Sequence, residues 1–152
     1  MGRKRLKILV LGFYYQPDLS AGSFRTTAFV DALKQRMPAD GQVDVLTTLP
    51  NRYNSFSIDA STEEKTLGLS IVRIALPPHH SGMFDQARAF ISFAREVSRQ
   101  IRGQEYDLVF ATSSRLMTAV LGAWLARKKR IPLYLDIRDI FVDTIKDVLP
   151  RH

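Results

Sequence analysis

Apolar and polar positions follow one another along this chain in blocks typical of strands that alternate with helices. Residues 6–11 form a continuous apolar run that ends at Gly12, the pattern of a central strand buried on both faces of a parallel sheet. The same analysis predicts further strands at 43–46, 69–76, 108–111 and 133–137, and helices at 24–37, 83–102 and 116–126. This order predicts an α/β fold: a doubly wound, mostly parallel sheet with helices on both faces and its ligand crevice at the carboxyl ends of the strands.

The last two predicted helices are unusually apolar. The helix at 83–102 has a broad apolar stripe, and its opposite face carries Arg88, Arg95, Arg99 and Arg102. Two interpretations are open for it, a core helix and a helix lying on an anionic membrane surface. The helix at 116–126 is apolar nearly all round, so we expect it to be buried.

Two loops contain polar groups of interest. Residues 47–62 mix proline, asparagine and serine without any period, which predicts an exposed loop, and Asn51 and Tyr53 in it are candidate acceptor contacts. His79 and His80 are adjacent, but they have no cysteine or carboxylate nearby at ligand spacing. We therefore interpret them as a solvated pair and predict no metal site.

The composition of the chain bears on the number of domains, the kinds of partner and the cellular compartment. The 152 residues, of which 45% are hydrophobic, predict a single domain over 1–152. The net charge of +7 favours phosphates, nucleic acids or anionic lipid as partners, or else only a solubilising surface. Motifs for RNA or DNA recognition are missing, so nucleic acid is not an expected partner. The lack of cysteine excludes disulfides and a cysteine nucleophile and, with no apolar run of about 18 residues, predicts a cytoplasmic protein.

The loop GFYYQPDLSAGSFR joins the first strand to the first helix, where backbone N–H groups and the helix dipole favour an anion. Its candidate anion-binding residues are Gly12, Gly22, Ser23 and Arg25. Neither G-x-G-x-x-G nor G-x-x-x-x-G-K-[ST] is present, which disfavours a standard dinucleotide site and a P-loop. The alternative, that the glycines only shape the turn, stays open.

Arg138 and Asp139 stand just past the last predicted strand, where such a sheet presents residues to a ligand. A carboxylate there can accept a hydroxyl proton or hold a sugar hydroxyl, although a helix cap or an ion pair explains it equally well. Asp136 lies two residues earlier on the same strand and is expected to face the crevice too. Ser113 belongs to a polar turn, residues 112–114, that follows another strand end.

Several segments together resemble the N-terminal domain of retaining GT-B glycosyltransferases that act in O-antigen, capsule and exopolysaccharide assembly. They are KILVLGFYYQPDLSAGSFRTTAFVDAL, VDVLTTLPNRY, IVRIALPP, FISFA, YDLVFATSS and YLDIRDIFVD, in this order. The resemblance implies a Rossmann-like acceptor-side domain whose partner is its own C-terminal, donor-binding domain, absent from this chain. It also implies a nucleotide-sugar as donor substrate, no other cofactor and no metal.

Carried over by position, Gly12 and Gly22 would border the donor phosphates, and Arg138 and Asp139 would lie beside the transferring sugar. Many relatives have His in place of Arg138 and Trp-Pro in place of Phe141-Val142. The resemblance further implies a lipid-linked saccharide as acceptor, and the arginine-bearing helix suits peripheral contact with an anionic membrane at the inner face of the cytoplasmic membrane. A standalone binding or regulatory domain without catalysis is the alternative from another class, because it would have the same fold.

Overall fold

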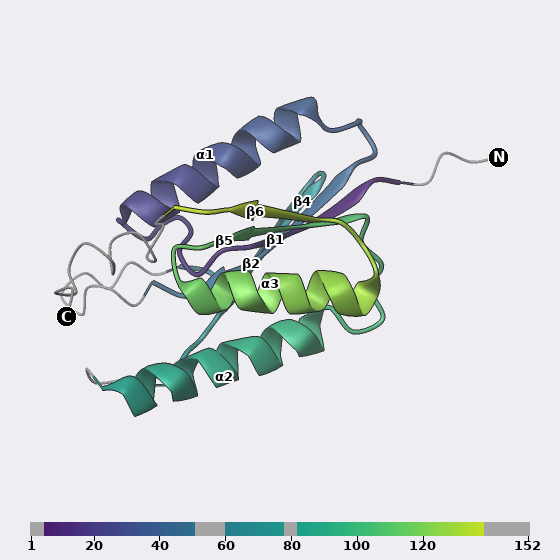
Figure 1. Ribbon diagram of the computed structural model, residues 1–152. Coiled ribbons are helices and arrows are strands. Elements are labelled where there is room, and N and C mark those ends of the chain that lie inside the picture. Colours follow the sequence, from purple (N-terminus) through teal and green to yellow (C-terminus); the bar gives the residue numbers. More distant parts are fainter. Residues whose placement is uncertain (1–4, 51–59, 78–81, 139–152) are drawn as a thin grey trace, which may run out of the picture.

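The computed structural model describes residues 5–50, 60–77 and 82–138, and its centre is a six-stranded sheet in the order β3-β4-β2-β1-β5-β6 (Figure 1). All neighbouring strands are parallel except the antiparallel pair β3 and β4. The predicted doubly wound α/β fold is confirmed. The strands are β1 (Lys7–Leu11), β2 (Gln42–Thr48), β3 (Glu63–Thr66), β4 (Leu69–Ile74), β5 (Leu108–Thr112) and β6 (Leu133–Asp136).

In the described part of the chain, three helices cover the two faces of the sheet. Helix α1 (Ala21–Arg36) lies on one face, and α2 (Met83–Gln100) and α3 (Leu116–Lys129) lie side by side on the other (Figure 1). Among the described helices, none combines the length and apolar character required to cross a bilayer.

Strand β1 divides the hydrophobic core into two layers. Ile8 and Val10 pack with α1, whereas Leu9 and Leu11 pack with the side chains of α2 and α3. Successive residues of a strand point to opposite faces, so a continuous apolar run is what a strand covered by helices on both sides requires. The central position predicted for this strand is confirmed by its pairing with both β2 and β5.

Helix α1 packs on the sheet through small and aromatic side chains. Ser23, Thr26 and Val30 are its buried residues. The ring of Phe29 stacks on that of Phe110 from β5, with 3.9 Å between the ring centroids. Phe24, an apolar position that helped to predict this helix, is 61% exposed, so apolar spacing located the helix but not its inner face.

The expected loop at 47–62 begins too early. Strand β2 continues through Thr47 and Thr48, which are buried and whose hydroxyls donate to the carbonyl oxygen of Phe13. Strand β3, which we did not predict, begins at Glu63, directly after the expected loop. All four side chains of β3 are exposed, so the strand shows no apolar period, and its backbone pairs with β4.

The prediction that the third helix is buried all round is also wrong. Helix α3 presents Leu121 and Leu125 to the core, but Leu116, Val120 and Trp124 on its other side are exposed. The sheet covers only the side of α3 that faces it, and the opposite side is left exposed. This leaves an apolar outer surface, which is considered below.

Helix α3 approaches the sheet closely at Gly122. A Cβ atom added there would lie 2.5 Å from the Cβ of Ala111 on β5, closer than real Cβ atoms approach. The glycine therefore sets the distance between α3 and the sheet.

We expect Gly122→Ala to lower the free energy of unfolding by about 1–3 kcal/mol, because the added methyl overpacks this contact. Helix propensity alone would act the other way and stabilise the variant by about 1 kcal/mol. Urea unfolding measures the net change, and Ala123→Gly at the exposed neighbouring position is the control, expected to lose about 1 kcal/mol. A stabilised Gly122→Ala variant would contradict the close contact.

Candidate functional site

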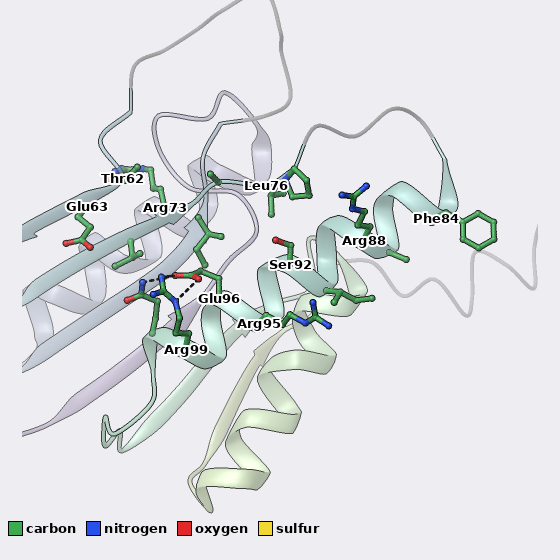
Figure 2. Close-up of a pocket in the computed structure, with 17 residues that line it drawn as sticks. Thr62, Glu63, Arg73, Leu76, Phe84, Arg88, Ser92, Arg95, Glu96 and Arg99 are labelled. Atoms are coloured by element: carbon green, nitrogen blue, oxygen red, sulfur yellow. Dashed lines mark hydrogen bonds and ion pairs between the residues drawn. The ribbon is translucent and has the colours of Figure 1, made fainter.

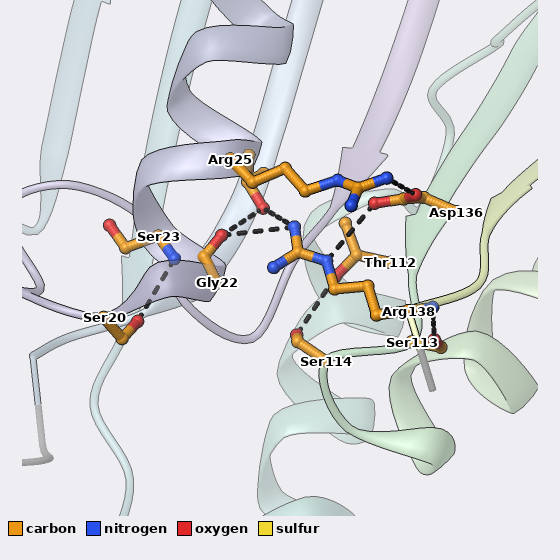
Figure 3. Close-up of polar contacts among 10 residues, drawn as sticks. Ser20, Gly22, Ser23, Arg25, Thr112, Ser113, Ser114, Asp136 and Arg138 are labelled. Carbon is orange, nitrogen blue, oxygen red and sulfur yellow. Dashed lines mark hydrogen bonds and ion pairs between the residues drawn. The ribbon is translucent and has the colours of Figure 1, made fainter. Parts of the chain in front are cut away.

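Three segments that are far apart in the sequence meet at the carboxyl edge of the sheet (Figure 3). They are the loop after β1 with the first turn of α1, the turn after β5, and the end of β6. Because β1, β5 and β6 are parallel neighbours, their carboxyl ends lie at the same edge. This edge is where doubly wound sheets bind ligands.

The amino-terminal end of α1 is the positive end of the helix dipole, and no acidic side chain in the first turn neutralises it. Ser20 is the N-cap, and its hydroxyl accepts a hydrogen bond of 3.1 Å from the backbone N–H of Ser23. The first turn contains no Asp or Glu. The helix dipole therefore favours an anion at this end.

Asp136 at the end of β6 holds two arginines together (Figure 3). Its carboxylate lies 2.7 Å from the guanidinium of Arg25 and 3.3 Å from that of Arg138. The side chains of Asp136 and Arg138 are 14% and 12% exposed, whereas that of Arg25 is 61% exposed. The cluster carries two positive charges and one negative charge, and Arg25 is its solvent-facing member.

Arg138 also docks on the first turn of α1. Its Nη2 donates to the carbonyl oxygen of Gly22 and to the hydroxyl of Thr26, at 3.3 and 3.2 Å. A Cβ atom at Gly22 would lie 3.2 Å from Nη1 of Arg138, so glycine leaves the space that the guanidinium occupies.

Gly12 allows a second close approach in the same loop. A Cβ atom there would lie 3.2 Å from the methyl group of Thr26. The left-handed glycine backbone occurs at Gly68 and Gly103 but at neither Gly12 nor Gly22 among the described residues. The two glycines of this loop thus serve close packing rather than a left-handed turn.

Ser113 belongs to the same cluster, because its hydroxyl accepts a 2.8 Å hydrogen bond from the backbone N–H of Arg138. The backbone N–H of Ser113 in turn donates to the carbonyl oxygen of Asp136. Ser113 thereby fixes where the chain leaves β6. The neighbouring hydroxyls of Thr112 and Ser114 are 3.0 Å apart and complete the polar turn.

Four buried polar side-chain atoms lack a hydrogen-bond partner within the described part of the chain. They are Tyr15 Oη, Asp18 Oδ1, Ser23 Oγ and Thr118 Oγ1. All four belong to the segments that follow β1 and β5 at the carboxyl edge. Buried polar groups are ordinarily paired, so their concentration here distinguishes this edge from the rest of the fold. Burial raises the pKa of Tyr15 to about 12, helped by the carboxylate of Asp31, so its hydroxyl stays protonated at neutral pH.

Sequence analysis missed one arginine of this edge. The guanidinium of Arg115, just before α3, donates to the hydroxyl of Tyr14 from Nε and Nη2 at 3.2 and 3.1 Å. It also lies 4.3 Å from the ring centroid of Phe13. Arg115 follows Ser114 directly, so its place in the turn after β5 was the only signal available.

A groove of about 1150 Å³ lies between α2 and the strands β3 and β4 (Figure 2). Its lining includes Arg73, Arg88, Arg95 and Arg99. Arg99 is paired with Glu96, and this hydrogen bonding lowers the pKa of the Glu96 carboxyl. Arg88 and Arg95 form no ion pair within the described residues, so they are the groove's available positive charges.

Arg73 is fully engaged in the fold. Its guanidinium donates to the carbonyl oxygens of Gln16 and Ser61 and to the carboxylate of Glu64, and the residue is only 3% exposed. It ties the loop after β1 to the segment that enters β3.

Some predicted residues lie outside the described part of the chain: Asp139, Asn51, Tyr53, His79 and His80. Their predicted roles therefore stay predictions. Of the predicted residues that are described, the structure brings Arg25, Arg138, Ser113 and the first turn of α1 into one cluster. Among the described residues there is no group of three His, Cys, Asp or Glu side chains placed to hold a metal ion.

Comparison with known proteins gives a family match over residues 26–151, to the glycosyl transferase 4-like domain. No curated protein sequence matches the chain. The C-terminal domain of a hydrogenase from Pyrococcus furiosus has a TM-score of 0.55 at 14% identity, with 90% of this chain and 95% of that chain covered. A UGT transferase from Siraitia grosvenorii in complex with UDP has a TM-score of 0.48 at 15% identity, with 86% of this chain and 27% of that chain covered. At the identity of the first, the likeness concerns the fold alone.

We expect Asp136→Asn to lower the free energy of unfolding by about 1.5–3 kcal/mol, because it removes the charge that pairs with Arg25 and the largely buried Arg138. Urea unfolding is the measurement. Asp31→Asn, at an exposed carboxylate of α1, is the control and should stay within about 0.5 kcal/mol of wild type. Equal effects of the two substitutions would show that Asp136 does not hold the cluster together.

Proposed function

We propose, since this chain belongs to the glycosyl transferase 4-like domain family, that it forms the acceptor-side half of a retaining GT-B glycosyltransferase. In this proposal a sugar passes from a nucleotide-sugar to a lipid-linked glycan during synthesis of a bacterial surface polysaccharide. The donor is bound mostly by a C-terminal half of the same protein. The observation that carries the proposal is the arginine cluster at the amino-terminal end of α1. Its members Ser113, Asp136 and Arg138 lie within the matched residues 26–151, and Arg25 directly precedes that range.

The cluster suits the leaving group of such a reaction. When the sugar departs, negative charge grows on the diphosphate of the nucleotide. The exposed guanidinium of Arg25 and the positive end of α1 face the same edge of the sheet, where they would stabilise that charge. Asp136 and Arg138 hold this arrangement in place before the donor arrives.

The transfer step uses one carboxylate that the resemblance places beside the sugar, Asp139. The bond between the anomeric carbon and the diphosphate oxygen breaks, and the acceptor oxygen forms a new bond to that carbon on the same face. The proton of the acceptor hydroxyl passes to the Asp139 carboxylate. In the sequence, Asp139 directly follows Arg138, the last described residue of the cluster.

The groove beside α2 is the proposed place of the acceptor. Arg88 and Arg95 supply positive charge for an acceptor diphosphate, and Leu76, Pro77 and Ile91 supply apolar lining. Such a mixture fits the junction between a glycan diphosphate and its polyprenyl chain. The protein would then work as a peripheral protein at the cytoplasmic face of the cytoplasmic membrane.

The test of this activity is transfer of a labelled sugar from nucleotide-sugars to polyprenyl-diphosphate glycans. A protein that carries both halves should transfer the label, whereas residues 1–152 alone should not, because donor recognition is assigned to the other half. Mass spectrometry of the extracted lipid measures the added sugar. Turnover by residues 1–152 alone would contradict the division of labour, and no transfer by the two-domain protein with any donor would contradict the activity.

In the two-domain protein we expect Asp139→Asn to lower kcat by about a hundredfold, because the amide cannot accept the hydroxyl proton. Steady-state kinetics with the natural acceptor is the measurement. Asp143→Asn, four residues later, is the matched control and should keep wild-type kcat. If Asp139→Asn also keeps wild-type kcat, the carboxylate has no part in proton transfer.

A further inference from the structure

Large apolar side chains are exposed mainly on two helices. Twelve such side chains are exposed in the described part of the chain, and seven of them belong to α2 and α3. They are Met83, Phe84, Ile91, Leu116, Met117, Val120 and Trp124. Figure 2 shows Phe84 at the end of α2, pointing away from the sheet, and it is 91% exposed. This concentration calls for a partner that covers both helices.

On α3 the exposed side chains form a regular row. Leu116, Val120 and Trp124 are spaced four residues apart, so they lie above one another on one side of the helix. The core side of the same helix holds Leu121 and Leu125. The row therefore faces away from the sheet along the whole helix.

The outer sides of the two helices are continuous. An apolar groove of about 680 Å³ runs between them, with Ile91 and Ala94 of α2 on one wall and Val120 and Trp124 of α3 on the other. We call this surface the α2–α3 face. Ile91, Arg95 and Arg99 line both this groove and the acceptor groove, so the α2–α3 face directly adjoins the proposed acceptor site.

The border of the α2–α3 face is basic. The two helices together contain six Lys or Arg residues and two Asp or Glu residues, and α3 contains no acidic residue. Lys128 Nζ lies 4.8 Å from the ring centroid of Trp124, and Arg102 lines the groove on the side of α2. Long basic side chains can lay their stems on apolar surface while their charges reach outward.

We propose that the α2–α3 face binds the surface of an anionic lipid bilayer, with Trp124 inserted at the level of the headgroups. Apolar side chains at the centre and cations at the border match the acyl region and the anionic headgroups of such a surface. A second copy of this chain, with its net charge of +7, would bring a like-charged border against the first. The proposal rests on the proposed function only for what the membrane presents, a lipid-linked acceptor next to its groove.

Trp124 is the only tryptophan of the chain and reports directly on this surface. Its fluorescence should shift to shorter wavelength when the 152-residue protein meets vesicles of phosphatidylglycerol and phosphatidylcholine. Vesicles of phosphatidylcholine alone should cause little shift. The shift should fade in about 1 M salt, where the Debye length falls to about 3 Å.

Two variants separate the apolar and the cationic contributions. Val120→Asp keeps the probe but should abolish the shift, whereas Leu67→Asp, at an exposed leucine in the turn between β3 and β4, should keep it. Changing Arg102, Arg127 and Lys128 to Gln should lower partitioning onto the anionic vesicles about a hundredfold, measured by sedimentation. These three residues lie outside the acceptor groove, so the variant leaves that site intact. Far-ultraviolet circular dichroism checks that each variant is folded.

The results that would overturn the proposal are distinct. An unchanged Trp124 spectrum with anionic vesicles removes the bilayer as partner, and equal binding to neutral vesicles removes the role of charge. Self-association that Val120→Asp abolishes, without vesicle binding, would assign the face to a second copy. No sugar is present in these measurements, so a failure of glycosyl transfer leaves the vesicle result standing, and the reverse holds too.

Discussion

The double-sided burial of β1 is the constraint on which the rest of the structure depends. Leu9, Val10 and Leu11 have no exposed surface, because helices cover both faces of the strand and β2 and β5 pair with both of its edges. A strand enclosed on four sides cannot shift its register or tilt without opening both core layers. Its carboxyl end therefore delivers the loop toward α1 to a fixed position, against which the other loops of the site are arranged.

This arrangement of strands fixes the positions of the residues in the candidate site. Thr112 of β5 is paired in register with Asp136 of β6, so the polar turn after β5 and the arginine cluster after β6 lie at one level. Asp136 then links the end of β6 to α1 through its two ion pairs. Arg25 thus meets a residue 111 positions later in the sequence, and Ser113 one that is 25 positions later. In the proposed chemistry, this geometry holds the exposed guanidinium of Arg25 in place beside the amino-terminal end of α1.

The sequence predicts the elements of this fold better than the surfaces they present. Apolar runs and helical spacing located the five parallel strands and the three helices, because burial on a sheet imposes those periods. Strand β3 was not predicted because its side chains are all exposed, so no apolar period marks it; backbone pairing with β4 and the ion pair of Glu64 with Arg73 hold it in place. The outer side of α3 was misjudged because an apolar helix has the same composition whether the core or a partner covers it. Arg138 and Ser113 were singled out by their places at strand ends, and Arg25 by its place in the segment that leads into the first helix. Their mutual contacts depend on long-range packing.

The buried guanidinium of Arg73 links the loop at the carboxyl end of β1 to the β3 strand at the outer edge of the sheet. It bonds at once to the loop after β1 through Gln16 and to the β3 hairpin through Ser61 and Glu64. A displacement of the β1 loop by an arriving ligand must either break several charge-assisted hydrogen bonds or carry the hairpin along. The hairpin borders the acceptor groove through Thr62 and Glu63. A displacement at the carboxyl edge of the sheet would thereby move one wall of the groove between α2 and the strands β3 and β4, so a single buried side chain would couple the two sites proposed above.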